Sequence, residues 1–248
     1  MGWPSGYRKL LLDEVDSTLN EAARIAPYIE DPVWILAKRQ TSARGRRGRA
    51  WQSPEGNLSA TLVLRPNESP DRAALRSFVA ALALYDACVT LTGRAESLSL
   101  KWPNDVLFNG GKLAGILLES SGQGGVLERL SIGIGVNLAE APGADQVEDG
   151  ALRPVCIASE TGLTITPEDF LTHLAQAYAV WEARFASYGF APIRDAWLSR
   201  AARLGETITA RTGTSETVGR FETVDETGNL VLNTAKGRAA IPAADIYF

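Results

Sequence analysis

The spacing of apolar residues changes near Leu204, and this change limits the fold more than any other feature of the sequence. Before it lie long segments of helical spacing, clearest at residues 71–91, where apolar side chains recur every three or four positions. After it, turn sequences separate short strand-like segments at residues 208–211, 218–223, 230–233 and 239–241. We therefore expect an α+β chain: a mixed β-sheet with helices over residues 1–202 and a small β-barrel domain over residues 203–248.

Local patterns in the first 202 residues predict both strands and helices. Strands are expected at residues 10–15, 33–37, 57–64, 97–101, 106–108, 112–119 and 127–136. Helices are expected at residues 18–28, 71–91, 169–187 and 191–202. A barrel of roughly 45 residues is near the lower limit for independent folding, so we expect it to pack against the first domain.

Composition narrows the class of protein. The 248 residues carry a net charge of −4, with 45% apolar and 22% charged residues, which is typical of a soluble globular enzyme. Cys88 and Cys156 are the only cysteines, so we expect a reducing, cytoplasmic location and no disulfide framework. No apolar run reaches the roughly 18–20 residues of a membrane span, and the first 12 residues do not read as a signal peptide. His173 is the only histidine, which excludes a metal site with two histidine ligands.

A loop of arginine and glycine is the first candidate site. Its basic residues are Lys38, Arg39, Arg44, Arg46, Arg47 and Arg49, with Gly45 and Gly48 between them. Three interpretations are open: a solvated charge run, a nucleic-acid patch, or a mobile clamp over a small anionic ligand. The acidic net charge argues against nucleic acid, whereas arginines on a flexible backbone suit carboxylate or phosphate. No G-x-x-x-x-G-K-[ST] phosphate loop is present, so any nucleotide must be held in another way.

A second candidate is the segment 101–105, Lys-Trp-Pro-Asn-Asp, with Lys112 seven residues further on. The chain has only five lysines, and two of them frame this hairpin. A lysine after a Gly-Gly turn suits a phosphate or a developing oxyanion, although an ordinary salt bridge explains it equally well. Asn104 and Asp105 could hold Mg²⁺, or they could simply form an Asx-turn.

Two further features could face a ligand. Residues 133–137 end a predicted strand with two glycines and Asn137, which could let a ligand touch the sheet or could mark a bulge. Trp51 could stack on a base or belong to the core. We interpret His173, inside a predicted helix, as structural.

Taken together and in this order, four segments resemble the biotin protein ligase family, that is, biotin–[acetyl-CoA-carboxylase] ligase. They are residues 44–49 with Trp51, residues 101–105, residues 111–119 (Gly-Lys-Leu-Ala-Gly-Ile-Leu-Leu-Glu) and residues 135–138 (Gly-Val-Asn-Leu). The resemblance implies a catalytic fold of the class II aminoacyl-tRNA synthetase-like type and a C-terminal SH3-like barrel. The pattern begins near residue 10, so the resemblance implies a ligase without the N-terminal DNA-binding domain, and no DNA binding is expected.

The resemblance also implies a two-step reaction. Biotin and ATP form biotinyl-5′-adenylate and pyrophosphate, with Mg²⁺, and a lysine of biotin carboxyl carrier protein then accepts the biotin. By matching position, Lys112 and Arg46 are the implied catalytic residues, and Asp105 is the implied metal ligand. The implied biotin-binding residues are Ser17, Thr18, Gln40, Arg44, Arg46, Lys112, Gly115 and Ile116. The implied ATP and adenylate residues are Arg44, Arg46, Trp51, Asn104, Asp105, Lys112 and Asn137.

Two positions depart from the family pattern. Leu19 stands where the family often has Asn, with Asn20 one place late, and Ala43 stands where the arginine loop usually begins with Gly. These departures leave the role of that Asn and the flexibility of the loop entry open. A homodimer is compatible with the resemblance.

Two other functions are weighed against this one. A lipoate or octanoate ligase or transferase shares the fold, but its Arg-Arg-x-Ser-Gly-Gly-Gly type of motif is absent. A non-catalytic nucleic-acid-binding module would use the arginine loop alone.

Overall fold

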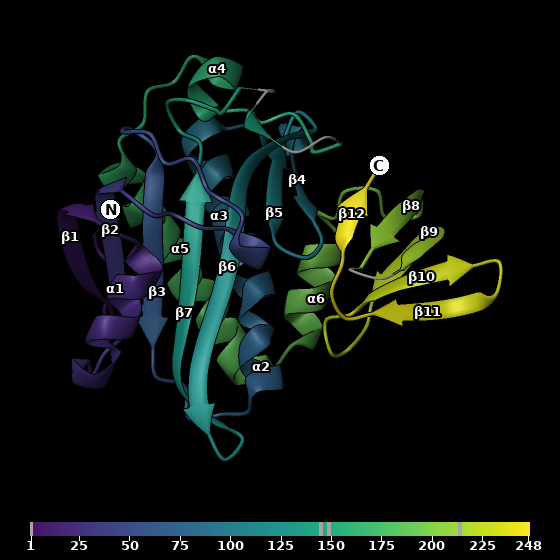
Figure 1. The fold of residues 1–248 in the computed structure, drawn as a ribbon, viewed down its shortest axis with the longest axis horizontal. Helices are drawn as coiled ribbons and strands as arrows, with labels where there is room; N and C mark the ends of the chain where they lie inside the picture. The colour runs from purple at the N-terminus through teal and green to yellow at the C-terminus, as the bar shows by residue number, and fades with distance from the viewer. Residues whose placement is uncertain (1, 144–145, 148–149, 213–214) are drawn as a thin grey trace.

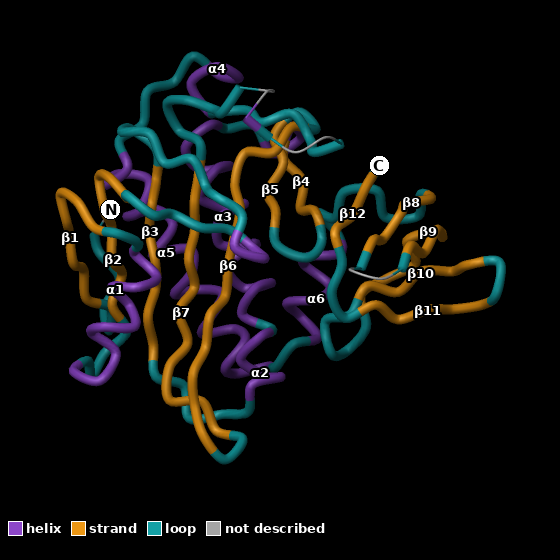
Figure 2. The backbone as a smooth tube through the Cα atoms, in the orientation of Figure 1, coloured by secondary structure: helices purple, strands orange, loops and turns teal. Residues whose placement is uncertain are grey.

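The computed structural model describes residues 2–143, 146–147, 150–212 and 215–248. A seven-stranded mixed sheet forms the larger part (Figures 1 and 2), with strand order β1-β2-β3-β7-β6-β5-β4. Only β1 and β2 pair in parallel among these neighbours. The strands are β1 (Arg8–Val15), β2 (Val33–Gln40), β3 (Leu58–Leu64), β4 (Leu98–Lys101), β5 (Asp105–Phe108), β6 (Gly111–Gln123) and β7 (Val126–Val136). The predicted mixed sheet is thus confirmed.

Helices cover both faces of this sheet, because β2 and β3 carry apolar side chains on both faces. Trp34 and Leu36 of β2 belong to the main core with α3 and α5, whereas Val33 and Ile35 pack with α1. The helices are α1 (Thr18–Ile25), α2 (Pro70–Ala74), α3 (Arg76–Thr92), α4 (Ile157–Thr161), α5 (Pro167–Tyr188) and α6 (Ala191–Leu198).

The C-terminal segment forms a five-stranded antiparallel sheet of order β11-β10-β9-β8-β12 (Figure 2). Its strands are β8 (Thr207–Arg211), β9 (Glu216–Val224), β10 (Leu230–Thr234), β11 (Gly237–Ile241) and β12 (Asp245–Tyr247). It packs on the larger part as expected: Trp102 Nε1 donates to Gly228 O at 3.1 Å, and Gly228 lies against Phe78. A Cβ at Gly228 would stand 3.0 Å from the Phe78 ring, so this turn needs a glycine.

Three local predictions need correction. The first helix ends at Ile25 rather than 28, because the chain continues as a separate 3-10 turn, Ala26–Tyr28, which contains Pro27. The predicted helix 71–91 is divided at Leu75 into α2 and α3. The short elements α4 and β12 were not predicted, because three to five residues carry too little periodicity.

The stretch Pro70–Thr92 is long and apolar enough to pass as a membrane span, which the sequence analysis did not anticipate. More than half of its most apolar 18-residue window is buried inside the protein, however. Its α3 portion packs against α5, α6 and the sheet, and Phe78 makes an edge-on contact with Trp197 at 5.4 Å. These contacts are those of a core helix.

Asn57, just before β3, holds the segment that follows β7 through side-chain hydrogen bonds. It is buried, and its Oδ1 accepts hydrogen bonds from the backbone N–H groups of Leu138 and Ala139 at 2.9 Å and Glu140 at 3.2 Å. Its Nδ2 donates to Glu140 O at 2.8 Å. One side chain therefore satisfies four backbone groups next to Asn137.

The variant Asn57→Ala is expected to lower the free energy of unfolding by about 2–3 kcal/mol, because those N–H groups lose their acceptor. Urea unfolding followed by circular dichroism measures the change. Asn233→Ala, at an exposed strand position, is the control and should stay within about 0.5 kcal/mol of the parent. An equally small effect of Asn57→Ala would contradict the argument.

Candidate active site

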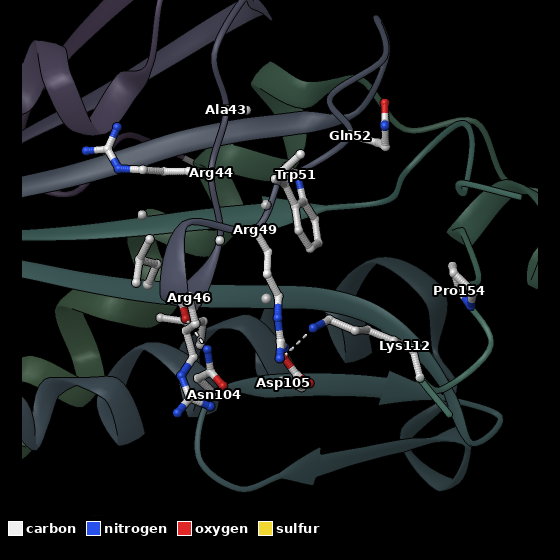
Figure 3. Close-up of a pocket in the computed structure, with 18 of the residues that line it drawn as sticks. Ala43, Arg44, Arg46, Arg49, Trp51, Gln52, Asn104, Asp105, Lys112 and Pro154 are labelled. Carbon is white, nitrogen blue, oxygen red and sulfur yellow. Dashed lines mark hydrogen bonds and ion pairs between the residues drawn. The ribbon is translucent and has the colours of Figure 1, made fainter. Parts of the chain in front are cut away.

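A cavity of about 460 Å³ lies over the ends of β6 and β7. The start of α1, the end of β2, the arginine loop, the β4–β5 hairpin and β12 all contribute lining residues. Figure 3 shows those of the arginine loop and the hairpin, together with Lys112. Every residue assigned to a ligand by resemblance lines this cavity: Ser17, Thr18, Gln40, Arg44, Arg46, Trp51, Asn104, Asp105, Lys112, Gly115, Ile116 and Asn137. The fold therefore gathers side chains that are as many as 120 positions apart in the sequence.

One end of the cavity carries neutral hydrogen-bonding groups. Gln40 Oε1 accepts from Thr18 N at 2.8 Å and from Thr18 Oγ1 at 3.1 Å. Thr61 on β3, which the sequence analysis missed, donates to Thr18 Oγ1 at 2.8 Å. Ser17 caps α1 by accepting from Leu19 N at 3.2 Å. This end suits an uncharged polar ligand group, because none of the charged side chains that the structure describes takes part in the network.

The wall of the cavity is formed by glycines and Trp51. Gly115 on β6 and Gly135 on β7 are directly paired across the two strands. The Trp51 indole lies across them: a Cβ at Gly135 would be 2.5 Å from its Cε2, and one at Gly115 would be 3.4 Å from its Cζ3. Gly135 is therefore required for this position of the indole. Beside them, Ile116 N donates to Asn104 O at 2.9 Å, which joins the β4–β5 hairpin to β6.

The other end of the cavity is cationic. Lys112 Nζ lies 2.8 Å from Asp105 Oδ1, and Lys101 Nζ lies 4.0 Å from Asp105 Oδ2. Burial lowers the pKa of Lys101, and Asp105 opposes this shift. Lys101 lines the cavity, yet the sequence analysis did not include it among the site residues. Its signal was present, since it is one of the two scarce lysines that frame the hairpin.

Two arginines of the loop have different surroundings. Arg46 Nη1 lies 3.2 Å from Ala244 O and 3.6 Å from Asp245 Oδ1, and burial lowers the pKa of Arg46. Arg44 forms a two-bond pair with Glu119 on β6, at 2.9 Å for each bond. Figure 3 shows the Arg44 side chain extending away from Lys112 and Asp105. Arg44 is therefore turned away from Lys112 and Asp105 in this structure, whereas Arg46 and Arg49 both line the cavity, and the charge of Asp105 acts on Arg46.

The two departures from the family pattern now have a structural explanation. Leu19 is buried against Gly133, whereas Asn20, one place later, accepts a hydrogen bond on its Oδ1 from Arg44 Nη1 at 2.9 Å. Ala43 does not adopt a positive φ, whereas Arg47 does, at 57°. The backbone strain of this loop therefore lies after its entry, and an alanine at the entry is tolerated.

Asn137 is buried at the end of β7. Its Nδ2 donates to Val155 O at 3.1 Å and its backbone N–H donates to Leu113 O at 3.0 Å. The amide is thus held in one orientation at the cavity edge, and among the described residues no donor reaches its Oδ1.

A resident metal site is not built by the described residues. They contain no group of three or more His, Cys, Asp or Glu side chains placed to share an ion. Asp105 lines the cavity with two ammonium groups beside it, and its Oδ1 has no well-aligned hydrogen bond. This donor set fits an Mg²⁺ ion that also binds substrate phosphates, since Mg²⁺ commonly takes only one or two protein carboxylates.

The sequence matches two known family profiles. The sequence profile of the Biotin/lipoate A/B protein ligase family matches residues 12–137, just over half of the chain. The chain belongs to this family. A second profile, Biotin protein ligase C terminal domain, matches residues 204–248, the segment that carries β8–β12. The resemblance inferred from the sequence is thus confirmed.

Two curated relatives match this chain along nearly all of its length. It is 56% identical over 238 residues to the biotin–[acetyl-CoA-carboxylase] ligase of Paracoccus denitrificans, covering 96% of this chain and 99% of that protein. It is 31% identical over 245 residues to the bifunctional ligase/repressor BirA of Bacillus subtilis, covering 97% of this chain and 74% of that protein.

Solved structures confirm the fold of the family member. The biotin protein ligase from Aquifex aeolicus in complex with biotin and ATP aligns with a TM-score of 0.82 at 28% identity, covering 96% of this chain and 97% of that one. The expected biotin ligase fold, including a small C-terminal barrel, is therefore confirmed. Family membership favours the anionic-ligand interpretation of the arginine loop over a nucleic-acid patch.

Proposed function

We propose that this chain is an ATP-dependent biotin–[acetyl-CoA-carboxylase] ligase. It attaches biotin to a lysine of biotin carboxyl carrier protein through biotinyl-5′-adenylate. The observation that carries the proposal is the cavity itself, which brings together a neutral hydrogen-bonding network at Thr18 and Gln40, the cation of Lys112 beside Asp105, and the Trp51 indole over Gly115 and Gly135. The 56% identical Paracoccus ligase supports the same activity.

The neutral end suits the ureido ring of biotin, which is polar but uncharged. We assign Ser17, Thr18 and Gln40 to this ring, and the Gly115–Ile116 backbone to the side of the ligand. Because the hydroxyls and the amide are already oriented by one another, the ring would meet preformed donors and acceptors.

The cationic end suits the first chemical step. An oxygen of the biotin carboxylate attacks the α-phosphorus of ATP, a new O–P bond forms, and the bond to the β-phosphate oxygen breaks to release pyrophosphate. Two anions must approach each other, and charge develops on the phosphates. Lys112 and Arg46 are the catalytic cations in this proposal, since both stand at this end of the cavity.

The second step transfers the activated acyl group. The amine of the acceptor lysine attacks the acyl carbon, the C–O bond to the phosphate breaks, and AMP leaves. The mixed anhydride is sensitive to water, so a loop that covers it protects the intermediate. We assign Trp51, Asn104, Asp105 and Asn137 to the adenylate side.

The Arg44 guanidinium is paired with Glu119 and Asn20 in this structure. We also propose that Arg44 contacts biotin or phosphate, and this contact requires it to exchange those partners. Asp105, with Asn104, is the proposed protein ligand of Mg²⁺. When bound with ATP, the ion would supply neutralisation of phosphate charge.

Three wider features belong to the same proposal. They are the division into a catalytic domain over 1–202 and a barrel domain over 203–248, a cytoplasmic location, and the carrier domain as protein partner. A homodimer is also proposed, and sedimentation analysis tests it.

A transfer assay tests the function directly. The protein is incubated with ATP, Mg²⁺ and labelled biotin or labelled lipoate, together with a carrier domain that has the acceptor lysine. We expect label from biotin on the carrier and none from lipoate. Transfer of lipoate instead would replace the proposal by a lipoate ligase, which belongs to the same family of sequence profiles.

The variant Arg46→Gly is expected to release biotinyl-adenylate about 10-fold faster than the parent, because a charge-assisted contact to the phosphate is lost. Rapid separation of protein-bound from free labelled adenylate measures this rate. Arg65→Gly, outside the cavity lining, is the control. Unchanged retention in Arg46→Gly would remove Arg46 from its assigned role.

A further inference from the structure

The C-terminal barrel places one carboxylate against the arginine loop. Asp245, at the start of β12, accepts a hydrogen bond from Arg47 Nη1 at 2.7 Å and one from Arg49 Nη2 at 3.0 Å, both on its Oδ2. Its Oδ1 lies 3.6 Å from Arg46 Nη1. The Asp245 side chain is only 15% exposed, so these charges interact with limited screening by solvent.

The two partners differ in rigidity. Asp245 stands between Ala244 and Ile246, which are both buried, and β12 pairs with β8. The loop, in contrast, contains Arg47 and Gly48 at positive φ and exposes most of its residues. The rigid barrel can therefore hold the loop in place, whereas the loop cannot impose a position on the barrel.

The contacts are also unequal among the arginines. Arg47 and Arg49 make short contacts with Asp245, whereas Arg46 makes a longer one. Arg46 and Arg49 both line the cavity, but only Arg49 is tied to Asp245 by a short contact. Arg46 thus keeps most of its donors for a ligand, while its two neighbours are fastened to the barrel.

We propose that Asp245 is a positioning residue: it anchors Arg47 and Arg49 so that Arg46 stands over the cavity. This inference rests on the proposed adenylate chemistry and gives the barrel a defined part in it. Asp245 touches no reacting atom; it acts through the loop. Without its charge, three neighbouring guanidinium groups repel one another, and the loop samples positions in which Arg46 no longer covers the intermediate.

The test uses the full chain and biotinyl-5′-adenylate as the probe. We expect Asp245→Asn to release the adenylate about 10-fold faster, with Asp245→Glu recovering most of the retention. Glu222→Gln removes another carboxylate of the barrel. Glu222 pairs with Arg238 at a distance of 3.0 Å, and neither residue lines the cavity, so this variant should leave the release rate unchanged.

A double-mutant cycle separates positioning from a general effect on the barrel. In the background Arg47→Gln with Arg49→Gln, the change Asp245→Asn should add less than 2-fold to the release rate, because both short contacts of Asp245 are already gone and only the longer one to Arg46 is left. Full additivity in this cycle would overturn the proposal. So would tighter adenylate or ATP binding by Asp245→Asn, since that result would make Asp245 a competitor of the phosphates.

The two levels of inference fail in different ways. If the parent protein did not retain biotinyl-adenylate at all, the proposed function would fail. If the parent retained it and Asp245→Asn retained it equally, only the role of Asp245 would fail.

Discussion

Replacing Lys112 with alanine is expected to slow adenylate formation by about 10²–10³-fold, because an oriented cation at the developing phosphate charge is typically worth a few kcal/mol. Lys112 Nζ is held 2.8 Å from Asp105 Oδ1 and is only one-third exposed, so the charge is already placed before the ligands arrive. Pyrophosphate release in a single turnover measures the rate. Affinity for biotin should change much less, since the neutral end of the cavity does not include this lysine.

Lys236→Ala is the matched control for this experiment. Lys236 lies in the exposed turn between β10 and β11 and does not line the cavity. It should leave adenylate formation unchanged. A parent-like rate in Lys112→Ala, with the protein folded, would contradict the catalytic assignment of Lys112.

Substituting alanine for Gly135 is expected to lower kcat/KM for adenylation by about 10–100-fold, since one stacked aromatic contact on a base is worth about 1–3 kcal/mol. The new Cβ would lie 2.5 Å from Trp51 Cε2, a separation that forces the indole to move. Gly135 lies within β7 and has no positive φ, so the backbone itself tolerates alanine. The loss should therefore fall on activity, with little change in the unfolding midpoint.

Gly115→Ala provides the comparison, because Gly115 is paired directly with Gly135 and faces the same indole. There the new Cβ would be 3.4 Å from Trp51 Cζ3, which is ordinary contact, so a change of less than about 5-fold is expected. Equal losses in both variants would show that the position of Trp51 is not what limits the reaction. Steady-state kinetics in ATP for the two proteins decides the question.

Much of the fold was predictable because the apolar periodicity of each helix and strand lies within a short stretch of sequence. The strands β2, β3 and β7 and the helix α5 each show a periodicity that local burial imposes, and they lie close to where they were expected. Where Pro27 intervened or an element was as short as β12, the pattern was too brief and the prediction was wrong or absent.

The candidate site was predictable in its membership but not in its internal pairings. The motif residues do line one cavity, as the family resemblance implied. Lys101 stood in a candidate segment and its scarcity marked it, but it was not assigned to a ligand; Thr61 was missed because a core threonine has no distinctive neighbours in sequence.

The sequence by itself determined the family, the mixed sheet with its barrel and the residue types of the cavity, because motifs and periodicity are written in neighbouring positions. Only the tertiary structure decided that Arg44 turns to Glu119 while Arg47 and Arg49 turn to Asp245. These guanidinium groups are nearly identical in local context, so nothing within the loop distinguishes them. Their partners are 75 to 198 positions away, and packing of β6 and of the barrel around the loop selects which carboxylate each arginine can reach.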